Sequence, residues 1–212
     1  NSIIMRGRRE GRLNCSLADR PYVKGVPFLV LLSLFIVVLI PGCATHTPTP
    51  AEEWYKKGYS LYSSGNYEEA IVAYDKAIEL NPGYSAAWYG KGKALSVLGR
   101  NEEAIVIYDG IGAWEAKGDV LEKIGRYEEA IAAYEKAVDL DPSFYRPWYK
   151  KGGALKAMGK YQEAITAYDK AIELNPNYAL VYGSRGSIYA HYKKYNKAII
   201  DLNKAIELNP NE

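Results

Sequence analysis

The chain has 212 residues, of which 48% are hydrophobic and 25% charged, a composition typical of a globular domain of ordinary size. The formal net charge of +2 is unevenly divided, because residues 1–42 carry six basic and two acidic side chains. Residues 43–212 are therefore slightly acidic, which excludes the basic surface that nucleic-acid binding requires.

Cysteine and histidine usage excludes two further classes of site. Cys15 and Cys43 both precede the main body of the chain, so a disulfide framework for that body is excluded. His46 and His191 have no neighbours at metal-ligand spacing. We therefore expect no metal site and no cofactor.

The first predicted element is a leader over residues 1–42 with an apolar run from 26 to 40, broken only by Ser33. As a helix this run would span roughly 22 Å, which is short of the roughly 30 Å hydrocarbon core of a membrane. Basic residues precede it and Pro41 ends it. This layout is typical of a secretory signal peptide. Residues 1–22 have the composition expected of an over-extended gene start, and we assign them no fold.

Residues 39–43, Leu-Ile-Pro-Gly-Cys, resemble the signal-peptidase site of prokaryotic lipoproteins. The resemblance implies cleavage before Cys43 and a lipid on its sulfur. The alternative is an uncleaved transmembrane anchor in which this cysteine is incidental. Both interpretations place the following residues on the outer face of the membrane, because a basic flank stays inside. Residues 43–50 are rich in threonine and proline and predict a semi-rigid tether of about 25 Å.

The rest of the chain repeats one pattern five times, over residues 51–84, 85–110, 111–144, 145–178 and 179–212. The aromatic residues that mark the copies are spaced by 34, 26, 34 and 34 residues; they are Trp54, Trp88, Trp114, Trp148 and Tyr182. In the first copy, one apolar stripe ends at residues 63–66 and a second runs from Ala70 to Ile78, each with helical spacing. Asn66 and Glu69 predict a capping box for the second helix, and Pro82 ends it.

This pattern resembles the tetratricopeptide repeat family, whose motif begins with tryptophan, continues through small residues and ends with proline. In the first copy the motif residues are Trp54, Gly58, Ala70, Tyr74, Ala77 and Pro82. The resemblance implies an all-α solenoid of about five stacked helix-turn-helix repeats in a right-handed superhelix. It also implies that Trp54 and Tyr74 belong to the core. Lysine or arginine replaces the leucine of the motif in every copy, with its stem expected on apolar neighbours.

Two copies depart from the pattern. The second lacks eight residues, and Arg100 stands where Asn66 would cap the helix. We expect its second helix to be shorter by about 12 Å and to form a soft joint near residues 100–113, unless the gap reflects a deletion in the gene model. The last copy has no polar closing helix. Its apolar stripe, with Ile199, Ala205 and Ile206, is expected to be partly bare and available for self-association.

The first helix of each pair lines a concave groove in this family. The candidate groove residues in successive copies are Glu52, Tyr55, Tyr59 and Tyr62; Tyr89, Lys93 and Ser96; Glu115, Asp119 and Glu122; Arg146, Tyr149 and Lys156; and Ser187 and His191. The groove is thus expected to change from aromatic to acidic to basic, with the tyrosines contacting a peptide. The lysine-asparagine clamp that some members use for acidic peptide tails is absent.

These patterns predict a non-catalytic scaffold for protein interaction, tethered through Cys43 and binding a protein or peptide segment. The alternative is an intracellular adaptor of the same fold without an anchor. Recurring acidic pairs such as Glu68-Glu69 fall in the first turn of each second helix, where the helix dipole favours them. No glycine-rich phosphate loop or nucleophile constellation is evident, so we expect no enzyme.

Overall fold

The computed structural model describes residues 47–210, so the predicted leader, Cys43 and half of the tether lie outside the described residues. Within this range the chain forms ten α-helices and no strand. In chain order they are α1 (Pro50–Ser63), α2 (Tyr67–Leu80), α3 (Ser85–Val97), α4 (Asn101–Gly110), α5 (Trp114–Lys123), α6 (Tyr127–Leu140), α7 (Tyr145–Ala157), α8 (Tyr161–Leu174), α9 (Ala179–His191) and α10 (Tyr195–Leu208). None of these helices is long and apolar enough to span a membrane.

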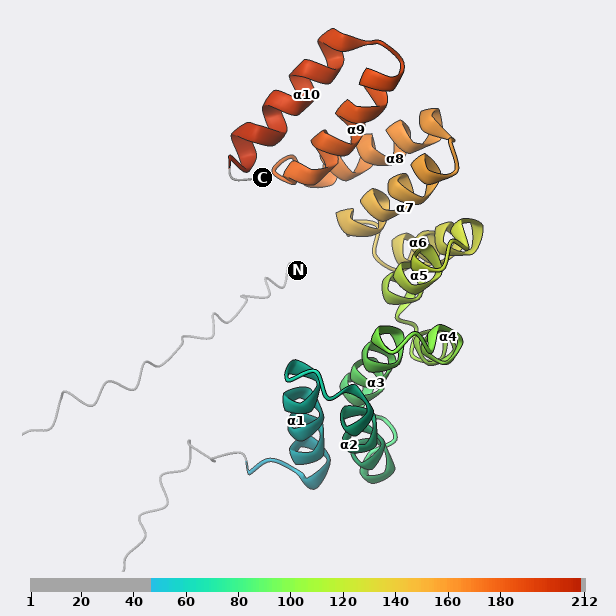
Figure 1. Cartoon of the computed structure of the whole chain (residues 1–212), viewed down its shortest axis with the longest axis vertical. Helices are drawn as coiled ribbons and strands as arrows, with labels where there is room; N and C mark the ends of the chain where they lie inside the picture. Colours follow the sequence, from blue (N-terminus) through green and yellow to red (C-terminus); the bar gives the residue numbers. More distant parts are fainter. Residues whose placement is uncertain (1–46, 211–212) are drawn as a thin grey trace, which may run out of the picture. The chain divides into compact units, whose positions relative to one another are not determined.

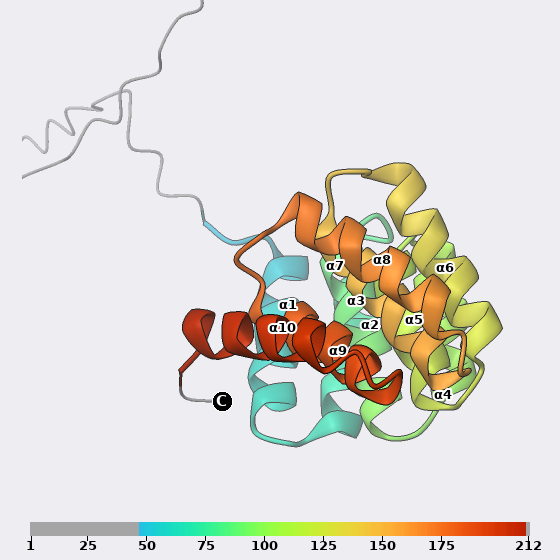
Figure 2. The same ribbon diagram turned by 90° about the horizontal axis from the view of Figure 1, so that it is seen from above.

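The helices form five consecutive pairs, as predicted. Each helix packs against the next one along the chain, which Figures 1 and 2 show from two directions. The buried side chains of residues 47–210 form four successive clusters along this stack instead of one central core. Stability in such an array comes from contacts between neighbouring pairs. The prediction of an all-α solenoid is confirmed.

The starts of the second helices differ from the prediction. Asn66 precedes α2, but its side chain makes no capping hydrogen bond, so the predicted box with Glu69 is wrong. A capping box occurs instead at α1, where Glu52 and Thr49 bond each other's backbone amides at 2.8 and 3.3 Å. The second repeat is not exceptional in having the basic residue Arg100 before its second helix, because basic residues also precede α6, α8 and α10. The predicted stop is confirmed, since α2 ends before Asn81-Pro82.

The motif tyrosines fill the junctions between helices. Tyr74, Tyr108, Tyr134 and Tyr168 are each at most 2% exposed. Each lies against the motif glycine of its own repeat, and at Gly118 an added Cβ would stand 2.4 Å from the ring of Tyr134. Because a Cβ contact that close is not tolerated without movement, the glycine sets how closely the paired helices approach.

The motif tryptophans are only half-buried, so their predicted place in the core holds in part. The ring of Trp54 packs against the first core cluster, and Lys57 Nζ lies 4.7 Å from its centroid. The ammonium groups of the other motif lysines lie over tryptophan rings in the same way, 5.3 to 5.8 Å from the centroids. The predicted placement of the lysine stems on apolar neighbours stays a prediction. The ammonium groups of these lysines also pair with the preceding helix, as Lys91 does with Asp75 at 2.6 Å. The same pairing recurs as Lys117–Asp109, Lys151–Glu135 and Arg185–Asp169.

The eight missing residues of the second repeat are shared between α4, α5 and the connection between them, which is 111–113 where the equivalent connections have one residue more. α4 has 10 residues where the other second helices have 14, and α5 has 10 where the other first helices have 13 or 14. The predicted shortening of α4 by about 12 Å is therefore wrong, because its four missing residues account for about 6 Å. The first helices of neighbouring repeats contact each other at α1–α3, α5–α7 and α7–α9, whereas α3 and α5 approach each other less closely.

Candidate binding groove

The predicted groove residues lie mainly on α1, α3, α5 and α7, and eleven of the fifteen candidates line connected hollows on these helices. We name three of these hollows. The tyrosine hollow is bordered by Tyr55, Tyr59, Tyr62, Tyr89 and Lys93; the junction hollow by Tyr89, Ala113, Trp114, Glu115, Ala116, Asp119, Phe144 and Arg146; and the charged hollow by Asp119, Glu122, Lys123, Tyr149 and Lys150. A fourth, with Ser96 and Lys123, joins them, because it also borders Tyr89 and Asp119.

The remaining candidates are engaged elsewhere. Lys156 donates a hydrogen bond to Ser187 at 2.7 Å, which ties α7 to α9. The ring of His191 packs at a tilt against Tyr161 of α8 with centroids 4.5 Å apart. Glu52 takes part in the capping box of α1. The groove that the hollows define therefore covers the first four repeats. Ser187 and His191, the candidates predicted in the fifth repeat, border none of these hollows.

At the tyrosine end of the groove, some side chains are exposed and others already pack against their neighbours. Tyr59 is 60% exposed and Tyr89 44% exposed, whereas Tyr55 is half-buried. Lys93 Nζ lies 5.0 Å from the ring centroid of Tyr62, and Tyr62 also packs edge-on against Tyr67. A rigid tyrosine presents a large amphipathic contact area at small conformational cost.

Acidic and basic side chains meet in the middle of the groove instead of following one another along it. Lys150 of α7 pairs with Asp119 of α5 at 2.8 Å, and Arg146 pairs with Glu115 at 3.3 Å. The predicted order of acidic and then basic fields is therefore wrong, because side chains 31 residues apart neutralise each other across adjacent first helices. Burial raises the pKa of Glu115, and the nearby Arg146 charge opposes that rise.

A core tyrosine reaches the groove floor at the same place. The Tyr134 hydroxyl lies 2.9 Å from Asp119 and 2.8 Å from Glu122. Burial and the two neighbouring carboxylates raise the pKa of Tyr134, so the hydroxyl stays protonated. A hydroxyl has one proton to donate, so Tyr134 bonds one carboxylate at a time. Asp119 also accepts from Lys150 at 2.8 Å, whereas Glu122 is left to accept from another donor whenever the hydroxyl bonds Asp119. Backbone N–H groups of a bound segment would supply such donors.

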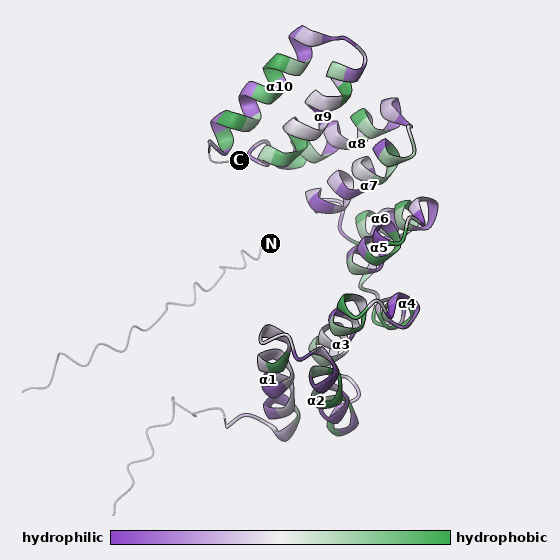
Figure 3. Cartoon of the chain, viewed as in Figure 1, coloured by the Kyte–Doolittle hydropathy of each residue, from purple (hydrophilic) through white to green (hydrophobic). Residues whose placement is uncertain are grey.

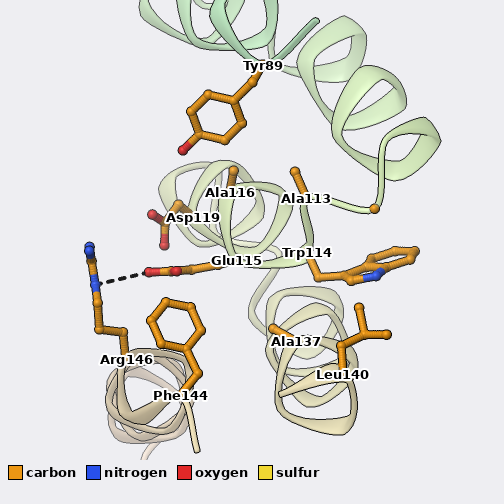
Figure 4. Close-up of a pocket in the computed structure, with 11 residues that line it drawn as sticks. Tyr89, Ala113, Trp114, Glu115, Ala116, Asp119, Ala137, Leu140, Phe144 and Arg146 are labelled. Atoms are coloured by element: carbon orange, nitrogen blue, oxygen red, sulfur yellow. Dashed lines mark ion pairs between the residues drawn. The ribbon is translucent and has the colours of Figure 1, made fainter. Parts of the chain in front are cut away.

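The junction hollow lies where α3 and α5 separate, and its volume is about 360 Å³. Figure 4 shows Tyr89 projecting from α3 toward Asp119, with the Glu115–Arg146 pair and Phe144 on one side. Trp114, Ala137 and Leu140 lie on the other side. Trp114, Phe144 and Lys150 were missing from the predicted groove. Phe144 could have been found, because an aromatic residue stands four positions before the motif aromatic in three of the copies.

Family models for the tetratricopeptide repeat match most of the helical array, with residues 107–117 outside the matches. One matches residues 51–84, 145–178 and 179–212, and two others match residues 118–159 and 73–106. This chain belongs to the tetratricopeptide repeat family.

Solved structures of other proteins share this arrangement. The crystal structure of MamA is 25% identical, with a TM-score of 0.63, and covers 72% of this chain and 94% of its own. YrrB, described as having an unusual peptide-binding site, is 26% identical with a TM-score of 0.58 and covers 76% and 88%. PilF of Pseudomonas aeruginosa, at 21% identity and a TM-score of 0.66, covers 75% and 76% and supports the fold alone. Curated protein sequences gave no match.

Proposed function

We propose that this tetratricopeptide repeat chain is a non-catalytic scaffold that binds an extended peptide or protein segment in its groove. The observation that carries the proposal is the continuous line of hollows from Tyr59 to Tyr149, with exposed tyrosines at one end and paired charges in the middle. Tyrosine faces supply contact area, and the Asp119–Glu122–Tyr134 group supplies acceptors for backbone N–H groups. The peptide-binding site named for YrrB, which is 26% identical, supports this use of the fold.

A peptide library displayed on phage and selected against the chain would test this proposal. Affinities of selected peptides would then be measured for Tyr59→Ala and Tyr89→Ala. Val106→Ala is the control, because Val106 is 71% exposed on α4 and borders none of the groove hollows. We expect each tyrosine variant to weaken binding about tenfold, as loss of an interfacial aromatic anchor does. Unchanged affinity in both tyrosine variants would eliminate the groove assignment.

We further propose that the scaffold is tethered outside a prokaryotic membrane by a lipid on Cys43. The support is the leader pattern and the lipobox-like residues 39–43, followed by a threonine- and proline-rich tether. Membrane fractionation and intact mass, measured beside Cys43→Ala, would test it. A membrane-bound species that begins at Cys43 with added lipid mass, and is lost in the variant, is the expected result. A soluble and unprocessed chain would favour the alternative, an intracellular adaptor without an anchor.

A further inference from the structure

The shortened second repeat removes an aromatic side chain that closes the groove in other repeats. Tyr55, Tyr89 and Tyr149 occupy equivalent positions in α1, α3 and α7. Each packs against the core tyrosine of its own repeat, with ring centroids 5.6 to 5.9 Å apart. In this contact the three repeats are alike.

The next contact differs among them. Tyr55 is also covered edge-on by Tyr84 at 5.2 Å, and Tyr149 by Tyr178 at 5.0 Å. Tyr84 and Tyr178 immediately precede α3 and α9, four residues before the motif aromatic. Four residues before Trp114 stands Gly110, and the residue immediately before α5 is Ala113. By either count, the ring that would cover Tyr89 is absent.

Tyr89 is consequently more open than its equivalents. It is 44% exposed, whereas Tyr55 and Tyr149 are half-buried. The space beside it is the junction hollow of about 360 Å³, whose floor includes Ala113 and Ala116. An apolar cavity of about 150 Å³ suffices to bind benzene, so the hollow has room for a phenyl ring and part of a backbone.

We propose, on the basis of the proposed peptide-binding function, that the junction hollow takes a phenylalanine or tyrosine side chain of the bound segment. The incoming ring occupies the place that Tyr84 and Tyr178 hold in the first and fourth repeats, edge-on to Tyr89. The Glu115–Arg146 pair and Asp119 border this place and meet the polar backbone of the segment. Edge-to-face aromatic pairs add to the burial of the rings and make an aromatic residue the preferred occupant.

Two blocked tripeptides test the proposal, acetyl-Ala-Phe-Ala-amide and acetyl-Ala-Ala-Ala-amide, titrated into the chain labelled on alanine methyl groups. We expect the phenylalanine peptide to shift the methyl resonances of Ala113 and Ala116 by its ring current, with at least fivefold higher affinity than the alanine peptide. Tyr89→Ala should remove that difference. The matched control Tyr55→Ala should keep it, because Tyr55 is already covered by Tyr84.

A second variant fills the hollow from within. Ala113→Tyr places an aromatic residue immediately before α5, where aromatic residues are found before α3, α7 and α9. We expect it to block the phenylalanine peptide without unfolding the array. Equal binding of both peptides would overturn the aromatic site and leave a groove without this preference. Binding of neither peptide, or retained preference in Tyr89→Ala, would also overturn it.

An independent observation concerns the last helix. An apolar stripe on α10 is exposed by 60, 55, 42 and 58% at Tyr195, Ile199, Leu202 and Ile206, and green segments mark the hydrophobic residues of this helix in Figure 3. The same stripe of α2 is covered by α3, so that Ile71, Tyr74 and Ile78 are buried. Bare Ile199 and Ile206 and half-buried Ala205 agree with the sequence prediction.

The side chains beside this stripe do not suit the first helix of another copy. α2, α4, α6 and α8 each present an acid to the cation of the following helix, but the equivalent residue of α10 is Asn203. At the start of α1 stands Glu53, where the corresponding residues of α3 and α9, Ala87 and Val181, are fully buried. Docking α1 of one copy on α10 of another would bury Glu53 and leave Lys57 opposite an amide.

We infer that a second copy covers this stripe by pairing α10 with α10 across a two-fold axis. The four apolar residues are spaced by four, three and four, the spacing of a coiled-coil seam. Asn196, Ala198, Asn203 and Ala205 flank the seam, so a symmetric pair brings no like charges together.

Sedimentation of the chain over a range of concentrations tests this pairing. We expect a dimer that Ile199→Asp converts to a monomer, whereas the control Val106→Asp, on exposed α4 surface, stays dimeric. Because Ile199 is exposed, its substitution leaves the monomer fold intact, which circular dichroism verifies. A monomeric parent chain, a dimer that persists in Ile199→Asp, or growth into open polymers would each contradict the two-fold pairing.

Discussion

The most informative stability test is the removal of Arg185, which ties three helices of the last two repeats. Its Nε and Nη2 atoms donate to both carboxylate oxygens of Asp201 at 2.8 and 2.7 Å, and Nη1 donates to Asp169 of α8 at 2.5 Å. Asp201 is only 4% exposed. The two carboxylates, Asp201 first, raise the pKa of Arg185 above its ordinary value. The guanidinium is therefore charged whenever the chain is folded.

Arg185→Ala leaves the buried Asp201 carboxylate without its cation. Breaking a buried pair from one side costs about 3–5 kcal/mol. The control is Lys151→Ala, which removes the equivalent cation of the preceding repeat. Its partner Glu135 is 52% exposed, so we expect a loss of at most about 1 kcal/mol.

A third variant separates charge burial from packing. α2, α6 and α8 carry alanine at the position of Asp201, namely Ala73, Ala133 and Ala167. Arg185→Ala with Asp201→Ala should therefore regain most of the loss, to within about 1 kcal/mol of the parent chain. Urea unfolding gives the free energies, and hydrogen exchange shows whether α9 and α10 open first. The reasoning is refuted if Arg185→Ala costs no more than Lys151→Ala, or if the double variant regains nothing.

Three further predictions follow from packing and burial. Gly118→Ala forces a Cβ to 2.4 Å from Tyr134 and should lower the free energy of unfolding in urea by about 1–3 kcal/mol. The control Gly153→Ala meets only ordinary contacts and should raise that free energy by up to about 1 kcal/mol. Equal effects of the two substitutions would contradict this role of Gly118. Burial raises the pKa of Tyr74 from 10.0 to about 12, so its share of stability is complete below pH 10.0 and is lost as pH rises through about 12. Helical circular dichroism should be lost over this pH range in the parent chain and only at higher pH in Tyr74→Phe, and the same pH dependence in both chains would refute this. Hydrogen exchange should be fastest within the array at residues 100–113, and uniform protection would exclude the soft joint.

Much of the candidate groove was predictable because its residues repeat at fixed positions on the first helices. Tyr55, Tyr89 and Tyr149 occupy one such position, and all three border the hollows. The pairing of Lys150 with Asp119 was not predictable from spacing within one helix, since the two side chains come from adjacent first helices. The Tyr134 hydroxyl was also missed, because the motif marks this residue as core and does not show where its polar end emerges.

The sequence by itself determined the helix pairs, the stop at Pro82 and the buried tyrosines. These depend on local spacing: glycine at 58 meets tyrosine at 74 within one pair, and Pro82 ends a helix wherever the pair lies. Only the tertiary structure decided how the eight missing residues divide among α4, α5 and their connection, and that Tyr89 is thereby left open. The physical reason is that a chain absorbs a deletion wherever the buried junctions on both sides are best preserved, and this balance involves residues far apart in sequence.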